Sequence, residues 1–232
     1  MKKLGIVLPG NIGDIIISLP IAKYYHDKGY EIHWPIYNII IENFKNHITY
    51  VNFYPLNIQN FNPIEESFKI LKEKKCEILD ISFTSPGSWG NENSKRFLDQ
   101  DELRFDEFRY KLANVPFDEK WNLSFDRILN REELLFNKLV KKEFCLIHLQ
   151  GSDVRKDIKI ANEKDHQIIE IKPETNSIFD WLKIIENAKA LVMIDSCFAN
   201  LIEQFNIKTK KFFIKRSQPK TTPTLRNDWI LI

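Results

Sequence analysis

An acidic residue follows two glycines near the start of the chain, in Leu8-Pro-Gly-Asn-Ile-Gly-Asp14. The apolar run 4–8 precedes this segment and an amphipathic run follows it, so the pattern predicts a tight turn between a strand and a helix. Gly10 and Gly13 supply unusual backbone angles at this turn and let a ligand approach the main chain. Asp14 can serve there as a helix cap, worth about 1 kcal/mol, or as a base that takes a proton from a substrate. Both roles are open from these residues alone.

A second candidate segment follows the apolar run 144–149, where a glycine and a serine precede two adjacent cations. Backbone amides, a hydroxyl and cationic side chains in one loop can grip phosphates. The residues concerned are Gly151, Ser152, Arg155 and Lys156. His148 lies inside the apolar run, and we interpret it as a packed core residue.

An acid and a hydroxyl, Asp195 and Ser196, come after the apolar run 190–194 and before a helical pattern. The first N–H groups of a helix are unpaired and carry partial positive charge, so they can receive a phosphate. Asn200 can donate a further hydrogen bond to phosphate or ribose. The alternative is that Asp195 and Ser196 only cap the helix.

Residues 84–96 interrupt the pattern with serines, glycines and amides around Trp89. They follow a predicted parallel strand, so they are expected at the carboxyl edge, where open α/β sheets bind ligands. Trp89 then offers a platform for a sugar or a base; the other interpretation is a surface loop with one aromatic side chain packed down. The residues that we expect to contact an acceptor are Asn11, Trp89, Asn91 and Arg96.

Two segments resemble signatures of one protein family. Residues 10–22, Gly-Asn-Ile-Gly-Asp-Ile-Ile-Ile-Ser-Leu-Pro-Ile-Ala, resemble the N-terminal signature of the heptosyltransferase-like glycosyltransferases (glycosyltransferase family 9), which have the two-domain GT-B fold. Residues 187–205 resemble the donor-site signature of the same family, in which Asp-Ser or Asp-Thr opens a helix. The usual continuation is Gly-x-x-His-Leu, and here Cys197 and Asn200 replace the glycine and the histidine.

The resemblance implies an enzyme of the hexosyl- or heptosyltransferase type, which moves a sugar from a nucleotide sugar to an acceptor hydroxyl. It implies inversion at the anomeric carbon, no tightly bound metal, and Asp14 as the base. Cations and helix-terminal amides would stabilise the leaving nucleoside diphosphate. The expected donor-binding residues are Gly13, Gly151, Ser152, Arg155, Lys156, Asp195, Ser196 and Asn200. No cofactor is expected, because the nucleotide sugar is the donor substrate.

The acceptor is open between a saccharide and DNA. The resemblance implies a growing surface saccharide, such as a lipopolysaccharide core or a capsule chain. Cations from Lys208 to Arg226, with no acid between Glu203 and Asp228, would also suit hydroxylated bases of DNA, as modified by some viral glycosyltransferases. Such a run can equally be a solvated face or neutralise a diphosphate. Because the formal net charge is only +2, composition does not indicate a polyanion partner, and we expect the saccharide.

Two other classes of protein fit the same residues. A sugar-nucleotide epimerase can share the fold but would need further acid–base groups. A noncatalytic nucleotide- or glycan-binding protein would be consistent with the replaced glycine and histidine.

Alternating strand and helix patterns predict an α/β protein of GT-B-like architecture, with two small Rossmann-like domains whose parallel sheets face a cleft. Strands are expected at 4–8, 30–34, 48–53, 77–83, 144–149, 167–171, 190–194 and 211–214, and an extended connector at 115–121. Besides the helix that contains Asp14, helices are expected at 36–44, 64–74, 105–113, 126–142 and 177–188. The expected domains are an acceptor-side domain, 1–125, a connecting helix, 126–143, and a donor-binding domain, 144–232.

Three widely separated cysteines lack metal-ligand spacing, which favours buried thiols in a cytosolic protein. No signal peptide or transmembrane run is found in the sequence. We therefore expect a cytoplasmic protein without a transmembrane segment.

Overall fold

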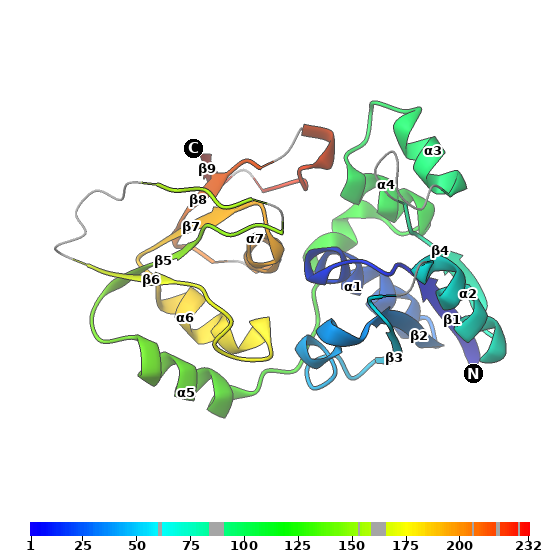
Figure 1. The fold of residues 1–232 in the computed structure, drawn as a ribbon, viewed down its shortest axis with the longest axis horizontal. Coiled ribbons are helices and arrows are strands. Elements are labelled where there is room, and N and C mark those ends of the chain that lie inside the picture. Colours follow the sequence, from blue (N-terminus) through cyan, green and yellow to red (C-terminus); the bar gives the residue numbers. More distant parts are fainter. Residues whose placement is uncertain are drawn as a thin grey trace. The chain divides into compact units, whose positions relative to one another are not determined.

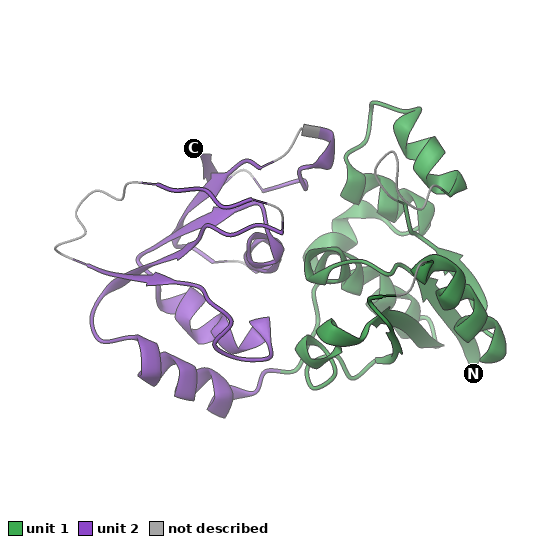
Figure 2. Ribbon diagram, in the orientation of Figure 1, with its two compact units in different colours: residues 1–126 green, residues 127–232 purple. Residues whose placement is uncertain are grey.

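The computed structural model of the chain describes residues 1–59, 62–83, 91–152, 154–158, 166–205, 207–216, 219–226 and 228–232. It divides the chain into two compact units, Met1–Asp126 and Arg127–Ile232 (Figure 2). Each unit is built on one sheet whose paired strands all run parallel.

Unit 1 contains a four-stranded sheet in the order β3-β2-β1-β4 (Figure 1). The strands are β1 (Lys2–Val7), β2 (Tyr30–Tyr37), β3 (Val51–Leu56) and β4 (Glu77–Asp80). Helices α1 (Ile12–Asp27) and α2 (Pro63–Glu73) both pack on β2, while α3 (Glu92–Leu98) and α4 (Phe105–Leu112) follow β4 in the chain.

The strand order of unit 1 creates a topological switch point between β1 and β4. The chain proceeds from β1 through β2 to β3, and then β4 pairs on the opposite side of β1. Ligands of open α/β sheets bind at the carboxyl edge beside such a point. The turn that leads to Asp14 and the segment after β4 both leave the sheet at this edge.

Unit 2 contains a five-stranded sheet in the order β6-β5-β7-β8-β9. Its strands are β5 (Phe144–His148), β6 (Gln167–Glu170), β7 (Ala190–Ile194), β8 (Lys210–Ile214) and β9 (Trp229–Leu231). Its helices are α5 (Leu129–Leu139), α6 (Leu182–Asn187) and α7 (Cys197–Glu203). The switch point lies between β5 and β7, where the segments starting at Leu149 and Asp195 leave the sheet.

The cores of the units explain why these runs become strands. Parallel strands covered on both faces need nearly continuous apolar sequence. In unit 1, Val7 packs with Ile64 and Leu71 of α2. In unit 2, Ile147 and Ile194 form part of a buried cluster with apolar residues of neighbouring strands.

Two local predictions were wrong, and one strand was not predicted. The helix expected at 36–44 is the end of β2 followed by a short 3₁₀ helix, η1 (Asn38–Asn43), because pairing of β2 with β3 continues to Tyr37 opposite Leu56. The extended connector at 115–121 contains another 3₁₀ helix, η2 (Phe117–Trp121). No strand was expected at Trp229–Leu231, yet it pairs with β8 as the edge strand β9. Short 3₁₀ turns and edge strands depend on tertiary neighbours that a local pattern does not contain.

The helix expected at 177–188 is a 3₁₀ turn, η3 (Ile178–Trp181), which continues into α6. Ser177 precedes η3, and its hydroxyl accepts a hydrogen bond from Phe179 N at 3.3 Å. The start expected at Ser177 is therefore correct, while the first turn is tighter than an α-helix.

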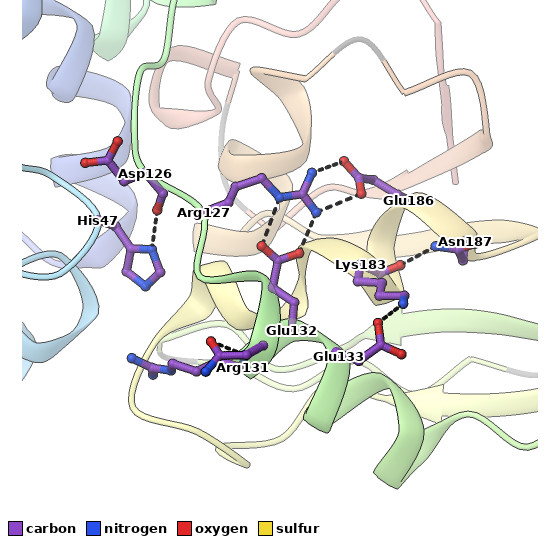
Figure 3. A network of polar contacts seen from close by, with 10 residues as sticks. His47, Asp126, Arg127, Arg131, Glu132, Glu133, Lys183, Glu186 and Asn187 are labelled. Atoms are coloured by element: carbon purple, nitrogen blue, oxygen red, sulfur yellow. Dashed lines mark hydrogen bonds and ion pairs between the residues drawn. The ribbon is translucent and has the colours of Figure 1, made fainter.

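Consecutive residues at the boundary are tied to different units (Figure 3). Asp126 belongs to unit 1: its N donates to His47 O at 2.7 Å and its carbonyl accepts from His47 Nδ1 at 2.7 Å. Arg127 belongs to unit 2: its Nε donates to Glu132 Oε1 at 2.9 Å and its Nη1 to Glu186 Oε1 at 2.7 Å. Helix α5, expected as a connector, thus lies in unit 2.

Within the described ranges, no helix combines the length and the apolar character that crossing a membrane requires.

Candidate functional site

Asp14 occupies the first turn of α1, directly after the glycine turn. Asn11 is the N-cap residue with an extended backbone, and its N–H donates to Asp14 Oδ2 at 3.1 Å. A Cβ atom on residue 10 would lie only 2.5 Å from Asp14 Cβ. Glycine at position 10 is therefore what allows the Asp14 side chain to fold back over the turn.

The second oxygen of this carboxylate is held by Arg109 of α4. Arg109 Nη2 donates to Asp14 Oδ1 at 3.1 Å, and the arginine side chain is only 3% exposed whereas that of Asp14 is 33% exposed. The guanidinium carbon lies 5.2 Å from the ring centre of Phe83 and 5.5 Å from that of Phe105. Among the described residues, Nε and Nη1 of Arg109 are buried without a hydrogen-bond partner.

Hydrogen bonds between α1 and α4 fix the position of Arg109. Tyr110 OH donates to Ile17 O at 2.9 Å, one turn of α1 beyond Asp14. Tyr25 OH donates to Ala113 O at 2.7 Å, at the end of α4. These two hydrogen bonds fix α4 against α1, and they thereby fix the position of the Arg109 side chain that α4 carries.

A buried ion pair supports α4 from its other side. Lys120 Nζ of η2 lies 2.7 Å from Asp106 Oδ2, and both side chains are almost completely buried. This pair joins the first turn of α4 to η2, so it stabilises the helix that carries Arg109.

Asp14 has contacts beyond those of a helix cap. Each carboxylate oxygen accepts one hydrogen bond, and part of the group remains open to solvent. A carboxylate oriented in this way can accept a proton from a hydroxyl group. A plain cap needs no buried arginine, which is costly to place in a protein interior.

Arg109 was not among the residues that the sequence analysis singled out. A signal for it exists in α4, where residues 105, 108, 109 and 112 share one helical face. On that otherwise apolar face, the arginine is the one charged residue. A cation at a position that the periodicity reserves for an apolar side chain was the available clue.

A second carboxylate, Asp80, ends β4 at the same sheet edge. Its backbone lies opposite Val7 in the pairing with β1, and its Oδ1 accepts from Ser82 N at 2.9 Å and Ser82 Oγ at 2.6 Å. Burial raises the pKa of Asp80, against the lowering effect of the two bonds from Ser82. The sequence analysis counted Asp80 only as part of a strand.

The expected acceptor residues of the following segment have different surroundings. Asn91 Oδ1 accepts from Ser94 N at 2.9 Å and caps α3, while its Nδ2 donates to Ser82 O at 2.9 Å. Arg96 is exposed on α3. Trp89 lies outside the described residues. The hydrogen bonds of Asn91 join α3 to the end of β4, and its role toward an acceptor stays a prediction, as does that of Arg96.

In unit 2, Ser196 is paired with His148 across the switch point. Ser196 Oγ and His148 Nδ1 share a hydrogen bond of 2.9 Å, and the histidine ring meets the Phe198 ring edge-on at 4.9 Å. Burial lowers the pKa of His148 to about 4, and the charge of Glu170 offsets only part of this effect. The imidazole is therefore neutral at pH 7 and can orient the hydroxyl of Ser196.

The other residues of this segment continue the sheet and begin the helix. Asp195 is buried, and its N–H donates to Ile214 O of β8 at 3.1 Å. Asn200 is buried in α7, with its N–H donating to Ser196 O at 3.1 Å. Gly13 was also expected to bind the donor. It lies in unit 1, in the first turn of α1.

The expected phosphate-binding residues of the loop after β5 have three different environments. Gly151 N donates to Val154 O at 2.8 Å and closes a turn. Arg155 Nη1 lies 2.7 Å from Glu170 Oε1 of β6, and this pairing raises the pKa of Arg155. Lys156 is exposed. Arg155 is thus engaged on the β6 side of the loop.

Arg216, which follows β8, also reaches this loop. Its Nη1 donates to Ser152 Oγ at 2.9 Å. A Cβ atom on Gly151 would lie 2.9 Å from Arg216 Cδ and 3.0 Å from Arg216 Nη1. The sequence analysis placed Arg216 only in a general basic run.

That basic run is not uniformly a solvated face. Lys211 is 2% exposed, forms an ion pair with Asp228, and lies 5.5 Å from the ring centre of Trp229. Of the alternatives left open for this run, a solvated face does not hold for Lys211, because Asp228, distant in sequence, is brought beside it by the pairing of β8 and β9.

Comparisons with known proteins found similarity only at the level of structure. No protein-family model matches the chain, and no curated protein matches it. E. coli ADP-heptose lipopolysaccharide heptosyltransferase II has a TM-score of 0.62 at 14% identity, over 100% of this chain and 90% of that one. A family 9 glycosyltransferase from Veillonella parvula has a TM-score of 0.64 at 8% identity, and the match covers 100% of this chain and 85% of that one. E. coli heptosyltransferase WaaC with ADP-2-deoxy-2-fluoro heptose has a TM-score of 0.52 at 12% identity, and the match covers 100% of this chain and 93% of that one.

The two parallel α/β units and these structural neighbours agree with the resemblance of the two sequence signatures. The chain has the GT-B-like fold of the heptosyltransferase-like glycosyltransferases of family 9.

Proposed function

We propose that this protein is a glycosyltransferase that transfers a sugar from a nucleotide sugar to an acceptor hydroxyl. The observation that carries the proposal is the Asp14 carboxylate, which Arg109 and the Asn11 N–H orient at the switch point of a unit with this fold. The switch point of unit 2, with Ser196, Gly151 and Ser152, is the proposed donor site.

The proposed reaction is a single displacement with inversion. The acceptor hydroxyl gives its proton to the Asp14 carboxylate while its oxygen attacks the anomeric carbon of the sugar. The bond between that carbon and the diphosphate oxygen breaks, and the nucleoside diphosphate leaves with the electron pair. A positioned base contributes roughly 10²–10⁴-fold to the rate of such a step.

The donor is proposed to be a sugar nucleotide of the kind that the structural neighbours hold. The solved structures of WaaC are of the enzyme with ADP and with ADP-2-deoxy-2-fluoro heptose, so ADP-heptose is the first candidate. Arginine side chains and backbone amides would hold the diphosphate and stabilise its charge as it leaves. We therefore propose that transfer needs no divalent metal and continues in EDTA.

For the acceptor we propose a saccharide. Lys211 is buried against Asp228, so the basic run presents fewer exposed cations to a polyanion than its sequence suggests. A DNA acceptor predicts binding that falls steeply with salt, at a log–log slope near −0.9 for each neutralised phosphate. A salt titration with duplex DNA, in which weak or absent binding is expected, tests this choice.

The function itself is tested by incubating the protein with a panel of nucleotide sugars and a panel of saccharide acceptors. Release of nucleoside diphosphate and a mass increase of the acceptor by one sugar residue are expected for at least one pair. Epimerisation of the donor without release would assign a different reaction. Binding of a nucleotide sugar without either change would identify a noncatalytic binding protein.

A further inference from the structure

We propose that His148 is a positioning residue of the donor site, whose Nδ1–H group turns the hydroxyl hydrogen of Ser196 toward a phosphate oxygen of the nucleotide sugar. This inference rests on the proposed function, because it refines the donor site of that reaction. Its evidence lies entirely within unit 2. It goes beyond the interpretation of His148 as a packed core residue.

The contact between His148 and Ser196 lies at the switch point of unit 2. His148 is the last residue of β5, and Ser196 comes two residues after the last residue of β7. These strands are paired neighbours, with Met193 opposite His148. The 2.9 Å hydrogen bond between His148 Nδ1 and Ser196 Oγ therefore spans the carboxyl edge of the sheet at the point where open α/β sheets bind ligands.

The side chain of Ser196 does not cap the helix that it precedes. Ser196 is the N-cap residue of α7 and has an extended backbone, yet its side chain forms no capping hydrogen bond with the described residues of this helix. A serine in this position normally accepts a hydrogen bond from a backbone N–H two or three residues further on. Ser177, the corresponding residue of η3, does accept one, from Phe179 N. The hydroxyl of Ser196 is directed to His148 instead, so capping does not account for it.

The hydrogens of the pair allow two arrangements. A serine hydroxyl has one hydrogen, and a neutral imidazole has an N–H on one ring nitrogen and a lone pair on the other. If Nδ1 has the lone pair, Ser196 donates its hydrogen to the ring and offers a ligand only lone pairs. If Nδ1 has the hydrogen, the ring donates to Ser196 Oγ and the hydroxyl hydrogen is left for a ligand. Because the oxygens of an ionised diphosphate only accept hydrogen bonds, the donor selects the Nδ1–H form.

The surroundings of the imidazole fix its orientation and keep it neutral. The ring of His148 meets the ring of Phe198 edge-on, with 4.9 Å between their centres, and Phe198 packs in turn against Trp181. The charge of Glu170 acts on the imidazole, but Glu170 is itself paired with Arg155. Burial lowers the pKa of His148 to about 4. At pH 7 the ring therefore contributes the direction of one hydrogen to diphosphate binding, and no positive charge.

Calorimetry on the full chain with inorganic pyrophosphate and with ADP tests the role of His148. We expect Ser196→Ala to weaken binding of both probes about tenfold, as for a lost hydrogen bond to a charged group, and His148→Leu to weaken it roughly fivefold. His148→Asn should bind within about twofold of the wild type, because its amide offers an N–H donor in place of Nδ1–H. The double variant Ser196→Ala/His148→Leu should bind like Ser196→Ala, because His148 acts only through the hydroxyl.

Ser177→Ala is the matched control, because this serine does cap its helix in the same unit. It should lower the melting temperature and leave pyrophosphate binding unchanged. Nitrogen-15 NMR of the labelled histidines reports the tautomer directly, and the signal missing from His148→Asn identifies His148. In the pyrophosphate complex we expect the proton on Nδ1. Circular dichroism melting curves verify that each variant is folded.

The possible results distinguish this inference from the proposed function. Wild-type binding that Ser196→Ala or His148→Leu leaves unchanged would overturn the role of His148 and leave the proposed reaction standing. Additive losses in the double variant, a proton on Nε2 in the complex, or failure of His148→Asn to restore binding would do the same. Failure of the wild type to bind pyrophosphate, ADP or any other nucleoside diphosphate would overturn both.

Discussion

Arg109 and Asp14, which are 95 positions apart in the sequence, meet through a 3.1 Å contact between Nη2 and Oδ1. The arginine is buried between aromatic rings, while the carboxylate stays partly exposed at the edge of the sheet. Nε and Nη1 of Arg109 have no hydrogen-bond partner among the described residues, which is an unfavourable state for a buried cation. This pair orients one partly exposed carboxylate, and the role of Asp14 as a catalytic base stays a prediction.

Replacing Asp14 by asparagine tests the base directly. Asp14→Asn should lower kcat by about 10²–10⁴-fold, because the amide cannot accept a proton. Its side-chain oxygen can still accept the hydrogen bond from Asn11 N, so the melting temperature should change little. Initial rates of nucleoside diphosphate release and thermal unfolding measure the two effects. Turnover near that of the wild type would reduce Asp14 to a helix cap.

Replacing Arg109 by methionine should separate stability from activity. The substitution removes a buried charge with two unpartnered N–H groups, so the free energy of unfolding should change by less than about 1 kcal/mol. The rate of transfer should fall at least tenfold, because Asp14 loses its orientation. Urea unfolding and kcat measurements test this, with Lys111→Met, an exposed change on the same helix, as the control. A strongly destabilised but fully active variant would show that Arg109 only supports the fold.

Gly10→Ala should act through Asp14. Because the new methyl group would lie 2.5 Å from Asp14 Cβ, the carboxylate must move out of its contacts with Asn11 and Arg109. We expect a destabilisation of about 1–3 kcal/mol and a fall in kcat. In an Asp14→Asn background the same change should have no further effect on kcat, since the two substitutions remove one function. Additive losses in the double variant would contradict this coupling.

His148 should make stability depend on pH. Its pKa is lowered to about 4 in the folded chain, against about 6.5 for an unperturbed histidine. Between these values the unfolded chain binds a proton that folded His148 does not, so the free energy of unfolding falls as the pH decreases from about 6.5 to 4. The full loss is about 3 kcal/mol.

Comparison with His148→Gln isolates this contribution, because the other titrating groups cancel in the difference. Between pH 7 and pH 4.5, the free energy of unfolding measured in urea should fall by about 2–3 kcal/mol more in the wild type than in His148→Gln. An identical pH dependence in the two proteins would mean that folding does not lower the pKa of His148.

Glu132 and Glu133 provide a matched pair at the start of unit 2 (Figure 3). Glu132 is 2% exposed and binds Arg127, whereas Glu133 forms a surface pair with Lys183. Glu132→Gln should destabilise the protein by roughly 2 kcal/mol, because it removes the charge of a buried carboxylate that pairs with Arg127. Arg127, whose side chain is 32% exposed, keeps its contacts with Glu186. Glu133→Gln should have no measurable effect on chemical unfolding. Equal effects of the two changes would argue against a structural role for the Arg127 network.

Local sequence determined the parts of this protein that depend on near neighbours. Apolar runs predicted eight of the strands that the sheets contain, because a strand buried on both faces needs continuous apolar sequence. The turn before Asp14 was equally evident, since Gly10, Asn11 and Asp14 interact within a few residues. The two sequence signatures led to the fold that the structural neighbours share.

Tertiary structure alone decided which distant side chains complete the sites. Arg109 reaches Asp14 because hydrogen bonds from Tyr25 and Tyr110 dock α4 on α1, and Arg216 reaches Ser152, 64 positions away, because β8 lies one strand beyond β7. The same strand order brings His148 to Ser196. Each contact depends on how the sheet arranges its strands and helices, and hydrophobic periodicity carries no information on which charged side chains will meet. The sequence therefore indicated where the candidate residues lie, and the packing of the elements decided which other side chains contact them.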